Sequence, residues 1–572
     1  MKHDFLWRPL ISDDLFKKYS FLEFYTFDGG GGFINRALLG SVKSDEITNL
    51  VLEKNILSDF GDLPCIDFKR YERWRSIEKS CWINRCYFLP ALAQQAWNTN
   101  DKNLADLVKN IMLHFFANCP PPTDIAAHWA RVEYRMEHDY NRKTYEEYSL
   151  DETDVEYIWY DFQPASRLIN FLHSLYFIIN IADFANDELN TIISRIHEHG
   201  RIIYQQELMR PDKKGNHQSI RQIALLHAAA IFPELSESQE WRNFAFRREE
   251  WHGITDFFVN GTLAENAPSY HAFETWHGRD LMLMAERFNY TLDAECVRRL
   301  RSAGDVLNIY RRPDGFSLTI NDAYPLASNA LLESMGVNIS NPERYALLEQ
   351  GGLAIFNSKK FYAALDVSNY TGQFSHYHAG KNAFILYYNG DAFLDDPGCS
   401  NYDDPRFRSC KQGNVHSSLL VDGAPDAHSF SVYGFDKVPE LKFTKWQGNK
   451  FTAVETSSVD EWQDVEFERS IECSDSEIVL TDTISGDREH IYTLLFTMSP
   501  SVYVELKDKS TIWLRNGKNS VEIKLLASDC KVFIVPATSY QSDPSKEIMQ
   551  LRLQFSPAKN IRSVIIFKEC KG

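Results

Sequence analysis

The chain has 572 residues and a formal net charge of −18, and 44% of its residues are hydrophobic. This length exceeds one typical domain, so the chain is expected to fold as two or three. The acidic balance, without a basic run, argues against a nucleic-acid partner, although a locally basic cleft is compatible with an anionic ligand. Because no apolar run is long enough to span a bilayer, a membrane-embedded protein is not expected.

The N-terminal segment, residues 1–14, lacks an apolar stretch of signal-peptide length. A cytoplasmic protein and the mature form of an exported one therefore both stay open. The ten cysteines are scattered along the chain and form no C-x-x-C pair. This spacing favours free, buried thiols over a disulfide framework.

Helical periodicity dominates the chain up to about residue 340. Apolar residues recur at steps of three and four, as in residues 168–179 and 189–196, which places them on one helix face. Further helical stretches are predicted near residues 86–117, 218–231, 237–251, 271–288 and 293–310. Successive helical hairpins of this kind are compatible with an (α/α) toroid, although periodicity alone does not establish closure.

Strand-length runs rich in Val, Ile, Phe and Tyr follow from about residue 345. They are Phe361–Val367, Phe384–Tyr388, Ser418–Val421, Ile478–Ile484, Val521–Leu526 and Val564–Phe567. Turn pairs flank several of them, namely Asn389-Gly390, Asp422-Gly423, Ser485-Gly486 and Asn516-Gly517. Many short strands with such turns are typical of an antiparallel β-sandwich.

The predicted organisation is thus an α+β multidomain chain in three parts. An N-terminal segment, residues 1–80, is expected to pack on the helical domain, and its run Gly29–Gly32 is interpreted as a loop. A helical domain covers residues 81–340, and a sandwich covers residues 341–572.

The segment His376-Tyr377-His378 is the strongest local feature. Side chains two apart share a face of a strand, so the two histidines are expected to point the same way. Asp396 ends the next apolar strand before a Pro-Gly turn, and His416 opens a later strand. Two histidines and a carboxylate on neighbouring strands are typical of a zinc site.

Two loops of the helical part carry further polar residues. Asn216, His217 and Gln218 follow Gly215 between two predicted helices, where Asn216 is alternatively a helix N-cap. Tyr270 and His271 open another predicted helix after a proline, where the tyrosine is alternatively an ordinary residue at the edge of the core.

Together these pieces resemble the heparinase II/III family of polysaccharide lyases, which includes heparan-sulfate lyases and oligoalginate lyases. The matching pieces are G-N-H-Q at 215–218, P-S-Y-H at 268–271, H-Y-H at 376–378, D-P-G at 396–398, Tyr402 with D-P-R at 404–406, and H-S-S-L-L-V-D-G at 416–423. The resemblance spans residues 165–425, and the order of helices and strands extends it over most of the chain. The family commonly has an acidic residue two positions after the second histidine, where this chain has Gly380.

The resemblance implies an (α/α) toroid followed by an antiparallel β-sandwich, and it implies roles for individual residues. Asn216 and His217 would contact a uronate carboxylate. Tyr270 would be the Brønsted base or acid with His376 as its partner, and Tyr402 would be a second catalytic candidate.

The resemblance also implies a zinc ion, which would hold the histidine segment in place rather than activate water. Its ligands would be His378, Asp396 and His416. Candidate substrate contacts are Gln218, His271, Arg279, Lys381, Arg406 and Arg408. The expected partner is an anionic polysaccharide or oligosaccharide, and the expected location is the periplasm or the exterior.

The expected reaction is β-elimination from a uronic-acid polymer, in which the C5 proton is removed and the C4–oxygen bond breaks. Donors such as Asn216 and His217 would stabilise the charge that develops on the carboxylate. Heparan sulfate and other glycosaminoglycans are favoured, with alginate or a bacterial exopolysaccharide as alternatives.

Two other classes of function stay open at this point. A glycoside hydrolase of the α/α-toroid type would use paired carboxylates, for which Glu265, Glu274 and Asp395 are candidates. A non-catalytic carbohydrate-binding protein would need neither Tyr270 nor His376.

Overall fold

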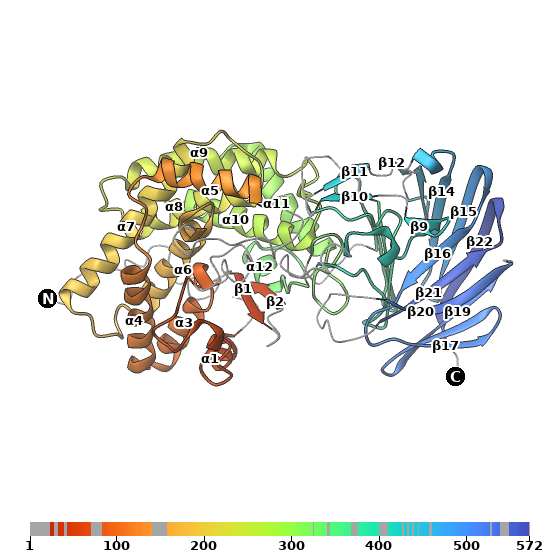
Figure 1. The fold of residues 1–572 in the computed structure, drawn as a ribbon, viewed down its shortest axis with the longest axis horizontal. Helices are drawn as coiled ribbons and strands as arrows, with labels where there is room; N and C mark the ends of the chain where they lie inside the picture. Colours follow the sequence, from red (N-terminus) through yellow and green to blue (C-terminus); the bar gives the residue numbers. More distant parts are fainter. Residues whose placement is uncertain are drawn as a thin grey trace. The chain divides into compact units, whose positions relative to one another are not determined.

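The structure is a computed structural model that describes most of the chain in two compact units (Figure 1). The described residues are 23–27, 33–38, 43–69, 83–139, 157–323, 325–339, 344–367, 376–399, 410–425, 428–431, 434–437, 440–443, 446–456, 460–526, 529–537 and 548–570. The described residues up to Asp256, with Phe273–Leu300, form the helical unit. Phe257–Ala272 and the described residues from Arg301 onward form the sheet unit.

Helices make up the first part of the chain, as the periodicity predicts. They are α1 Ser44–Leu52, α3 Leu89–Thr99, α4 Lys102–Asn118, α5 Ile125–Asp139, α6 Gln163–Ile178, α7 Asn186–Leu208, α8 Asn216–Ile231, α9 Ser238–Thr255, α10 Pro268–Arg287, α11 Ala294–Ile309 and α12 Asn329–Ser334. The stretch predicted near residues 86–117 is two helices. Asn100 is left-handed with φ 53°, and the Asp101 side chain caps α4 by accepting from the backbone N–H groups of Asn103 and Leu104.

Alternate helices of the helical unit pack with one another. In one layer, His173 of α6 stacks on His227 of α8 at 5.5 Å between ring centroids, and His227 lies 3.0 Å from Asp280 of α10. In the other layer, α7 meets α9 where Gly200 packs on the Trp241 indole, and α9 meets α11 where Gly253 packs on Cys296. One layer of α6, α8 and α10 and another of α7, α9 and α11 is the alternation of an (α/α) toroid, so the predicted fold class is confirmed.

Antiparallel sheets make up the sheet unit, and the predicted change from helices to strands is confirmed. One sheet has the order β12-β13-β14-β15-β22-β19-β18-β17, a second β20-β21-β16-β8-β9 and a third β3-β4-β5-β6-β7. The strands are β3 Tyr345–Leu348, β4 Leu353–Asn357, β5 Phe361–Asp366, β6 Phe384–Tyr388, β7 Asp391–Leu394, β8 Leu419–Val421, β9 Ala424–Pro425, β12 Glu440–Phe443, β13 Lys450–Thr456, β14 Glu466–Cys473, β15 Glu477–His490, β16 Tyr492–Thr497, β17 Tyr503–Asp508, β18 Thr511–Asn516, β19 Asn519–Leu526, β20 Cys530–Ala537, β21 Ile548–Phe555 and β22 Ala558–Glu569. The hairpins β1 Glu23–Phe27 with β2 Phe33–Leu38, and β10 His428–Ser431 with β11 Gly434–Lys437, are separate.

The third sheet is buried on both faces. Phe361, Ala363 and Leu365 of β5 belong to the main apolar core, which the three larger sheets share. Tyr362 and Ala364 point to the opposite face and pack with Tyr310. Residues that precede β6 and follow β7 lie at one end of this sheet because the two strands are antiparallel neighbours. His378 and Asp396 occupy those positions.

The predicted turns behave differently from one another. Asn389-Gly390 and Asp422-Gly423 have positive φ at both residues and join β6 to β7 and β8 to β9. Asn516-Gly517 joins β18 to β19. The turn predicted at Ser485-Gly486 is wrong, because both residues continue strand β15, whose pairing with β22 becomes irregular after Ser485. The Gly29–Gly32 loop lies outside the described residues.

The cysteines of the described residues are all free, and most are buried, as their spacing predicts. No helix in the described part of the chain is long and apolar enough to cross a membrane.

The close packing of α7 on α9 predicts the effect of a single methyl group. A Cβ at Gly200 would lie 2.4 Å from Cη2 of Trp241. Gly200→Ala should therefore lower the free energy of unfolding by about 1–3 kcal/mol, which urea denaturation measures. Ser194→Ala, on the exposed side of α7, is the control and should change stability little. Equal stability of Gly200→Ala and the wild type would contradict this packing.

Candidate active site and candidate metal centres

Tyr270 and His376 lie against each other in the sheet unit. Tyr270 is the third residue of α10, and its ring stacks on the His376 imidazole with 3.9 Å between centroids and 23° between planes. Tyr270 is 6% exposed and the His376 side chain is 14% exposed. A phenol and an imidazole in such contact are two groups able to carry a proton, held at one place.

Asp322 joins three basic groups at this place. One of its carboxylate oxygens accepts from Nδ1 of His376 at 3.0 Å, and the other lies 2.6 Å from Nε2 of His378. The Lys411 ammonium lies 3.3 Å from Asp322 and is buried. The carboxylate therefore fixes both histidine rings and is itself neutralised.

The charges explain the acidity of Asp322. Burial alone would raise its pKa, but the Lys411 ammonium and the hydrogen bonds from His376 and His378 hold its pKa well below the ordinary value. These contacts keep Asp322 ionised at neutral pH. Burial lowers the pKa of His378 to about 4, against the opposing effect of Asp322, so that this imidazole is neutral at pH 7.

The histidine segment is held by Asn321 rather than by strand pairing. Residues 376–380 are irregular, so the prediction that His376 and His378 lie on a strand is wrong. Asn321, at φ 57°, accepts from the backbone N–H of His378 at 3.0 Å and donates to the carbonyl of Asn266. Both histidine rings nevertheless contact the same carboxylate, that of Asp322.

His217 is oriented by a second buried carboxylate, in the helical unit. Its Nδ1 lies 2.5 Å from Asp161, and its ring packs on Phe162 at 4.2 Å between centroids. The His217 side chain is 56% exposed. An exposed imidazole fixed at one nitrogen by a carboxylate is arranged to present its other nitrogen to a ligand.

Asp161 is itself held by arginine. Arg221, fully buried on α8, donates to it at 2.7 Å and also pairs with Glu207. Burial would raise the pKa of Asp161, but His217 and Arg221 lower it far below the ordinary value. The carboxylate is thus a fixed negative charge behind His217.

Gly215 sets the start of α8 and the position of Asn216. Gly215 has φ 113°, a conformation that favours glycine, and its N–H donates to Asp256 at 3.0 Å. Gly215 is the N-cap, and Asn216 is the first helical residue. The alternative in which Asn216 caps the helix is therefore wrong, and the Asn216 side chain is half-buried.

The remaining predicted contact residues are mostly buried. Gln218 accepts from the backbone N–H of Lys213, His271 lies 2.8 Å from the carbonyl of Ala303, and Arg279 pairs with Asp280 at 2.8 Å. Lys381 lies over the Tyr377 ring at 4.9 Å. These contacts support local structure, and the substrate roles stay predictions. Tyr402, Arg406 and Arg408 lie outside the described residues.

The predicted metal ligands of the sheet unit are brought together in part. His416 Nδ1 lies 2.7 Å from Asp396, and the rings of His378 and His416 are 5.6 Å apart. Burial would lower the pKa of His416, but the Asp396 carboxylate raises it. Within the described residues, Nδ1 of His378 and Nε2 of His416 are buried and have no hydrogen-bond partner. Each histidine thus has one nitrogen on a carboxylate and one buried nitrogen without a partner among the described residues, but the donor atoms of His378, Asp396 and His416 do not all lie within 4.8 Å of one another.

Gly380, where the family commonly has an acidic residue, lies against the His416 ring. A Cβ at this position would lie 3.1 Å from Nδ1 of His416. A side chain here would therefore need the His416 ring to shift by a few tenths of an ångström.

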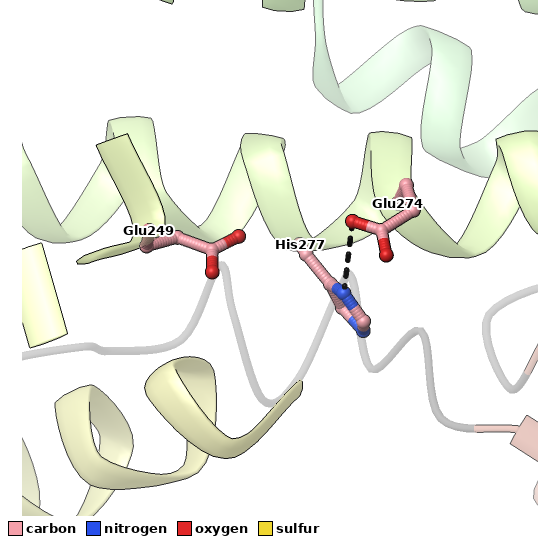
Figure 2. A group of neighbouring side chains, drawn as sticks. All are labelled: Glu249, Glu274 and His277. Atoms are coloured by element: carbon pink, nitrogen blue, oxygen red, sulfur yellow. Dashed lines mark ion pairs between the residues drawn. The ribbon is translucent and has the colours of Figure 1, made fainter. Parts of the chain in front are cut away.

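A different group meets the spacing of metal ligands more closely. The donor atoms of Glu249, Glu274 and His277 in the helical unit all lie within 4.8 Å of one another (Figure 2). Glu274 is also one of the carboxylates predicted for the alternative glycoside hydrolase function. It is fully buried on α10 beside His277, at 3.6 Å. Asp395, another such candidate, accepts from the Tyr387 hydroxyl at 2.9 Å and is buried.

The supporting residues Asp161, Asp322 and Lys411 were not found from the sequence. Each lies far along the chain from the residue that it contacts. Asp322 and His376, for example, are 54 residues apart. The only local signal was the Asn321-Asp322 pair, which is typical of a turn.

Two models of one known protein family match most of the chain. The heparinase II/III N-terminal family model matches residues 58–341, and the heparinase II/III-like C-terminal model matches residues 340–549. The chain belongs to the heparinase II/III-like family. It is therefore a polysaccharide lyase by family, and the resemblance seen in its motifs is confirmed. No curated protein matches the chain by sequence.

Solved structures share the fold of this lyase at low sequence identity. A heparinase III structure is 16% identical to this chain, with a TM-score of 0.68. The match covers 89% of this chain and 80% of the heparinase III chain. A heparinase III gene product is 14% identical with a TM-score of 0.65 and coverages of 92% and 84%. A heparan sulfate lyase HepC from Pedobacter heparinus is 15% identical with a TM-score of 0.59 and coverages of 92% and 83%. These likenesses bear on the fold alone.

The bridging position of Asp322 predicts the outcome of its substitution. Asp322→Asn leaves the buried Lys411 charge uncompensated, which should cost about 3–5 kcal/mol of stability. It also releases the His376 ring, so turnover of a cleaved polymer should fall by about 100-fold. Urea denaturation and steady-state kinetics measure the two effects separately.

Asp464→Asn is the matched control. Asp464 also binds a buried histidine, His490, at 3.3 Å in the sheet unit. Its substitution should lower stability and leave turnover within about twofold of the wild type. If both variants kept full turnover, Asp322 would have no role in positioning His376.

Proposed function

We propose that this lyase cleaves a uronic-acid-containing polysaccharide by β-elimination, with a glycosaminoglycan such as heparan sulfate as the favoured substrate. The stacking of Tyr270 on His376 carries the proposal. These are the two residues that the resemblance makes base and acid, and Asp322 holds one of them in a single orientation.

In the reaction the C5–H bond breaks, and its electron pair moves into a C4–C5 double bond as the C4–oxygen bond breaks. The base takes the C5 proton, and the acid gives a proton to the leaving oxygen. Since Asp322 accepts the Nδ1 proton of His376, the neutral ring carries its lone pair on Nε2, which suits His376 to the role of base. Tyr270 then acts as the acid, or as base and acid in turn when both groups lie on one face of the sugar.

Asn216 and His217 complete the proposal by binding the uronate carboxylate. Removal of the C5 proton places enolate charge on that carboxylate, and hydrogen-bond donors stabilise the charge as it forms. The support for this role is the exposure of His217 and its fixed orientation on Asp161.

The choice among uronic-acid polymers rests on the relatives. Solved structures with this fold are described as heparinase III and as a heparan sulfate lyase. Alginate and exopolysaccharides are the alternative substrates. Heparan sulfate, chondroitin sulfate and alginate, offered in parallel, decide among them.

Ultraviolet absorbance tests the reaction directly, because β-elimination creates a conjugated C4–C5 double bond. The wild type should raise the absorbance on at least one of the polymers. Tyr270→Phe keeps the ring and removes the hydroxyl, so turnover should fall by about 100-fold or more while the substrate still binds.

Tyr362→Phe is the control for loss of a buried hydroxyl, since the described residues offer the Tyr362 hydroxyl no hydrogen-bond partner. It should retain full turnover. Release of reducing ends without absorbance would indicate a hydrolase instead, and unchanged turnover of Tyr270→Phe would remove this residue from the mechanism.

We further propose that zinc is bound by His378, Asp396 and His416 and holds the histidine segment. The two buried ring nitrogens that lack a hydrogen-bond partner among the described residues support this site. Zinc would contribute a structural crosslink, with His376 two residues from a ligand.

Removal of zinc tests this role. Chelation should lower the melting temperature and the turnover of the wild type, and re-addition of zinc should restore both. Before chelation, His416→Gln should already have a lower melting temperature and a lower turnover than the wild type. Re-addition of zinc should restore less of both quantities, because one ligand is lost. Glu249 and Glu274 are intact in both proteins, so any metal bound by these residues of the helical unit affects the melting temperature of both proteins equally. Full activity and an unchanged melting temperature after chelation of the wild type would overturn the proposal.

A further inference from the structure

A second group of metal-ligand type lies in the helical unit and shares no residue with those assigned to the reaction. Glu249 comes from α9, and Glu274 and His277 come from α10 at a spacing of three residues. Residues three apart lie on one face of a helix, so Glu274 and His277 act together. Figure 2 shows the two carboxyl groups turned toward each other, with the His277 imidazole beside Glu274.

The three side chains are almost completely removed from solvent. Glu249, Glu274 and His277 are 2%, 1% and 2% exposed. Buried carboxylates are expected to have a cationic partner or a full set of hydrogen bonds. Two such groups side by side therefore need an explanation.

The carboxyl groups keep unused acceptors. In the part of the chain that the structure describes, Oε2 of Glu249 and Oε1 of Glu274 have no hydrogen-bond partner. Burial, and then the charge of Glu274, raises the pKa of Glu249 well above its ordinary value. Burial and the charge of Asp256 raise the pKa of Glu274 to about 8. Without a cation, burial therefore favours the protonated form of these two carboxyl groups.

Ser219 of α8 arranges the ligand atoms. Its hydroxyl donates to Oε1 of Glu249 at 2.8 Å and lies 2.8 Å from Nδ1 of His277. That nitrogen is also 3.6 Å from Oε2 of Glu274. Nδ1 thus faces the carboxyl groups. While the Ser219 hydroxyl donates to Glu249, Nδ1 carries the ring proton and donates to the Ser219 oxygen; binding of a cation moves that proton to Nε2 and turns the Nδ1 lone pair from Ser219 to the cation.

We propose that Glu249, Glu274 and His277 bind a divalent cation of the zinc type, which links α9 to α10 inside the helical unit. One imidazole and two carboxylates suit zinc, whereas calcium and magnesium prefer sets of oxygen ligands. A tetrahedral zinc with bonds of about 2.1 Å separates its donors by about 3.4 Å, so donors within 4.8 Å of one another reach it by small side-chain rotations. The cation neutralises two buried charges, and its role is structural.

Metal content of the full-length protein tests the proposal, with zinc as the probe. The experiment uses a His416→Gln background, so that the site proposed in the sheet unit does not contribute. After chelation, dialysis against zinc and removal of the excess, this protein should keep one zinc per chain. Adding Glu249→Gln and Glu274→Gln, which preserve shape and remove both charges, should abolish that zinc.

Glu250→Gln in the same background is the matched control. Glu250 neighbours Glu249 on α9 and accepts instead from the backbone N–H of Asp293. This variant should retain its zinc. Equal zinc in the Glu249→Gln/Glu274→Gln protein and in its parent would overturn the proposal.

A measurement on wild-type protein covers the case in which the variants fail to fold. Crystals grown with zinc should give an anomalous difference peak between Glu249, Glu274 and His277 at the zinc edge. No peak there, in crystals grown with zinc in the medium, would overturn the proposal.

Discussion

The buried Asp322 carboxylate is the interaction on which the candidate active site depends. It receives His376, His378 and Lys411 in a region from which water is excluded. Burial of a carboxylate without partners costs much free energy, and a buried carboxylate attracts nearby positively charged groups strongly. The loop that carries Asp322 is fixed in turn, because Asn321 bonds to the backbone of both His378 and Asn266. The tyrosine at the start of α10 and the histidine before β6 thereby meet although 106 residues separate them in the sequence.

The same physical device appears in the helical unit. Asp161 fixes His217 as Asp322 fixes His376, and each carboxylate is kept ionised by a buried cation, Arg221 in one case and Lys411 in the other. A histidine held by a carboxylate has a defined tautomer and little rotational freedom. Both catalytic candidates are therefore arranged before any substrate arrives, which is the arrangement that lowers the cost of reaching the transition state.

Much of this architecture was predictable from the sequence, because helices and strands leave regular patterns. The apolar steps of three and four located α6 and α7, and Asn389-Gly390 located the turn between β6 and β7. Motif resemblance selected Tyr270 and His376, whose rings are in contact in the structure. The failures have local causes. Asn100 ends α3 and so interrupts one predicted helical stretch, and Ser485-Gly486 lies inside strand β15, which continues beyond the predicted turn.

The residues behind the site were beyond sequence reasoning. Asp161, Asp322 and Lys411 act through contacts between distant segments, which periodicity does not encode. The Glu249, Glu274 and His277 group was missed for the same reason, since it joins two helices. Buried charges of this kind are rare enough to be informative once the fold brings them together.

The central claim is that the bond is broken by elimination rather than by water, and mass spectrometry of a defined oligosaccharide tests it most directly. A uronic-acid oligosaccharide of known length is cleaved once, and the masses of the two products are added. Elimination predicts a sum equal to the mass of the substrate, with the unsaturated uronate on one product. A sum larger by one water molecule would show hydrolysis and would contradict the account.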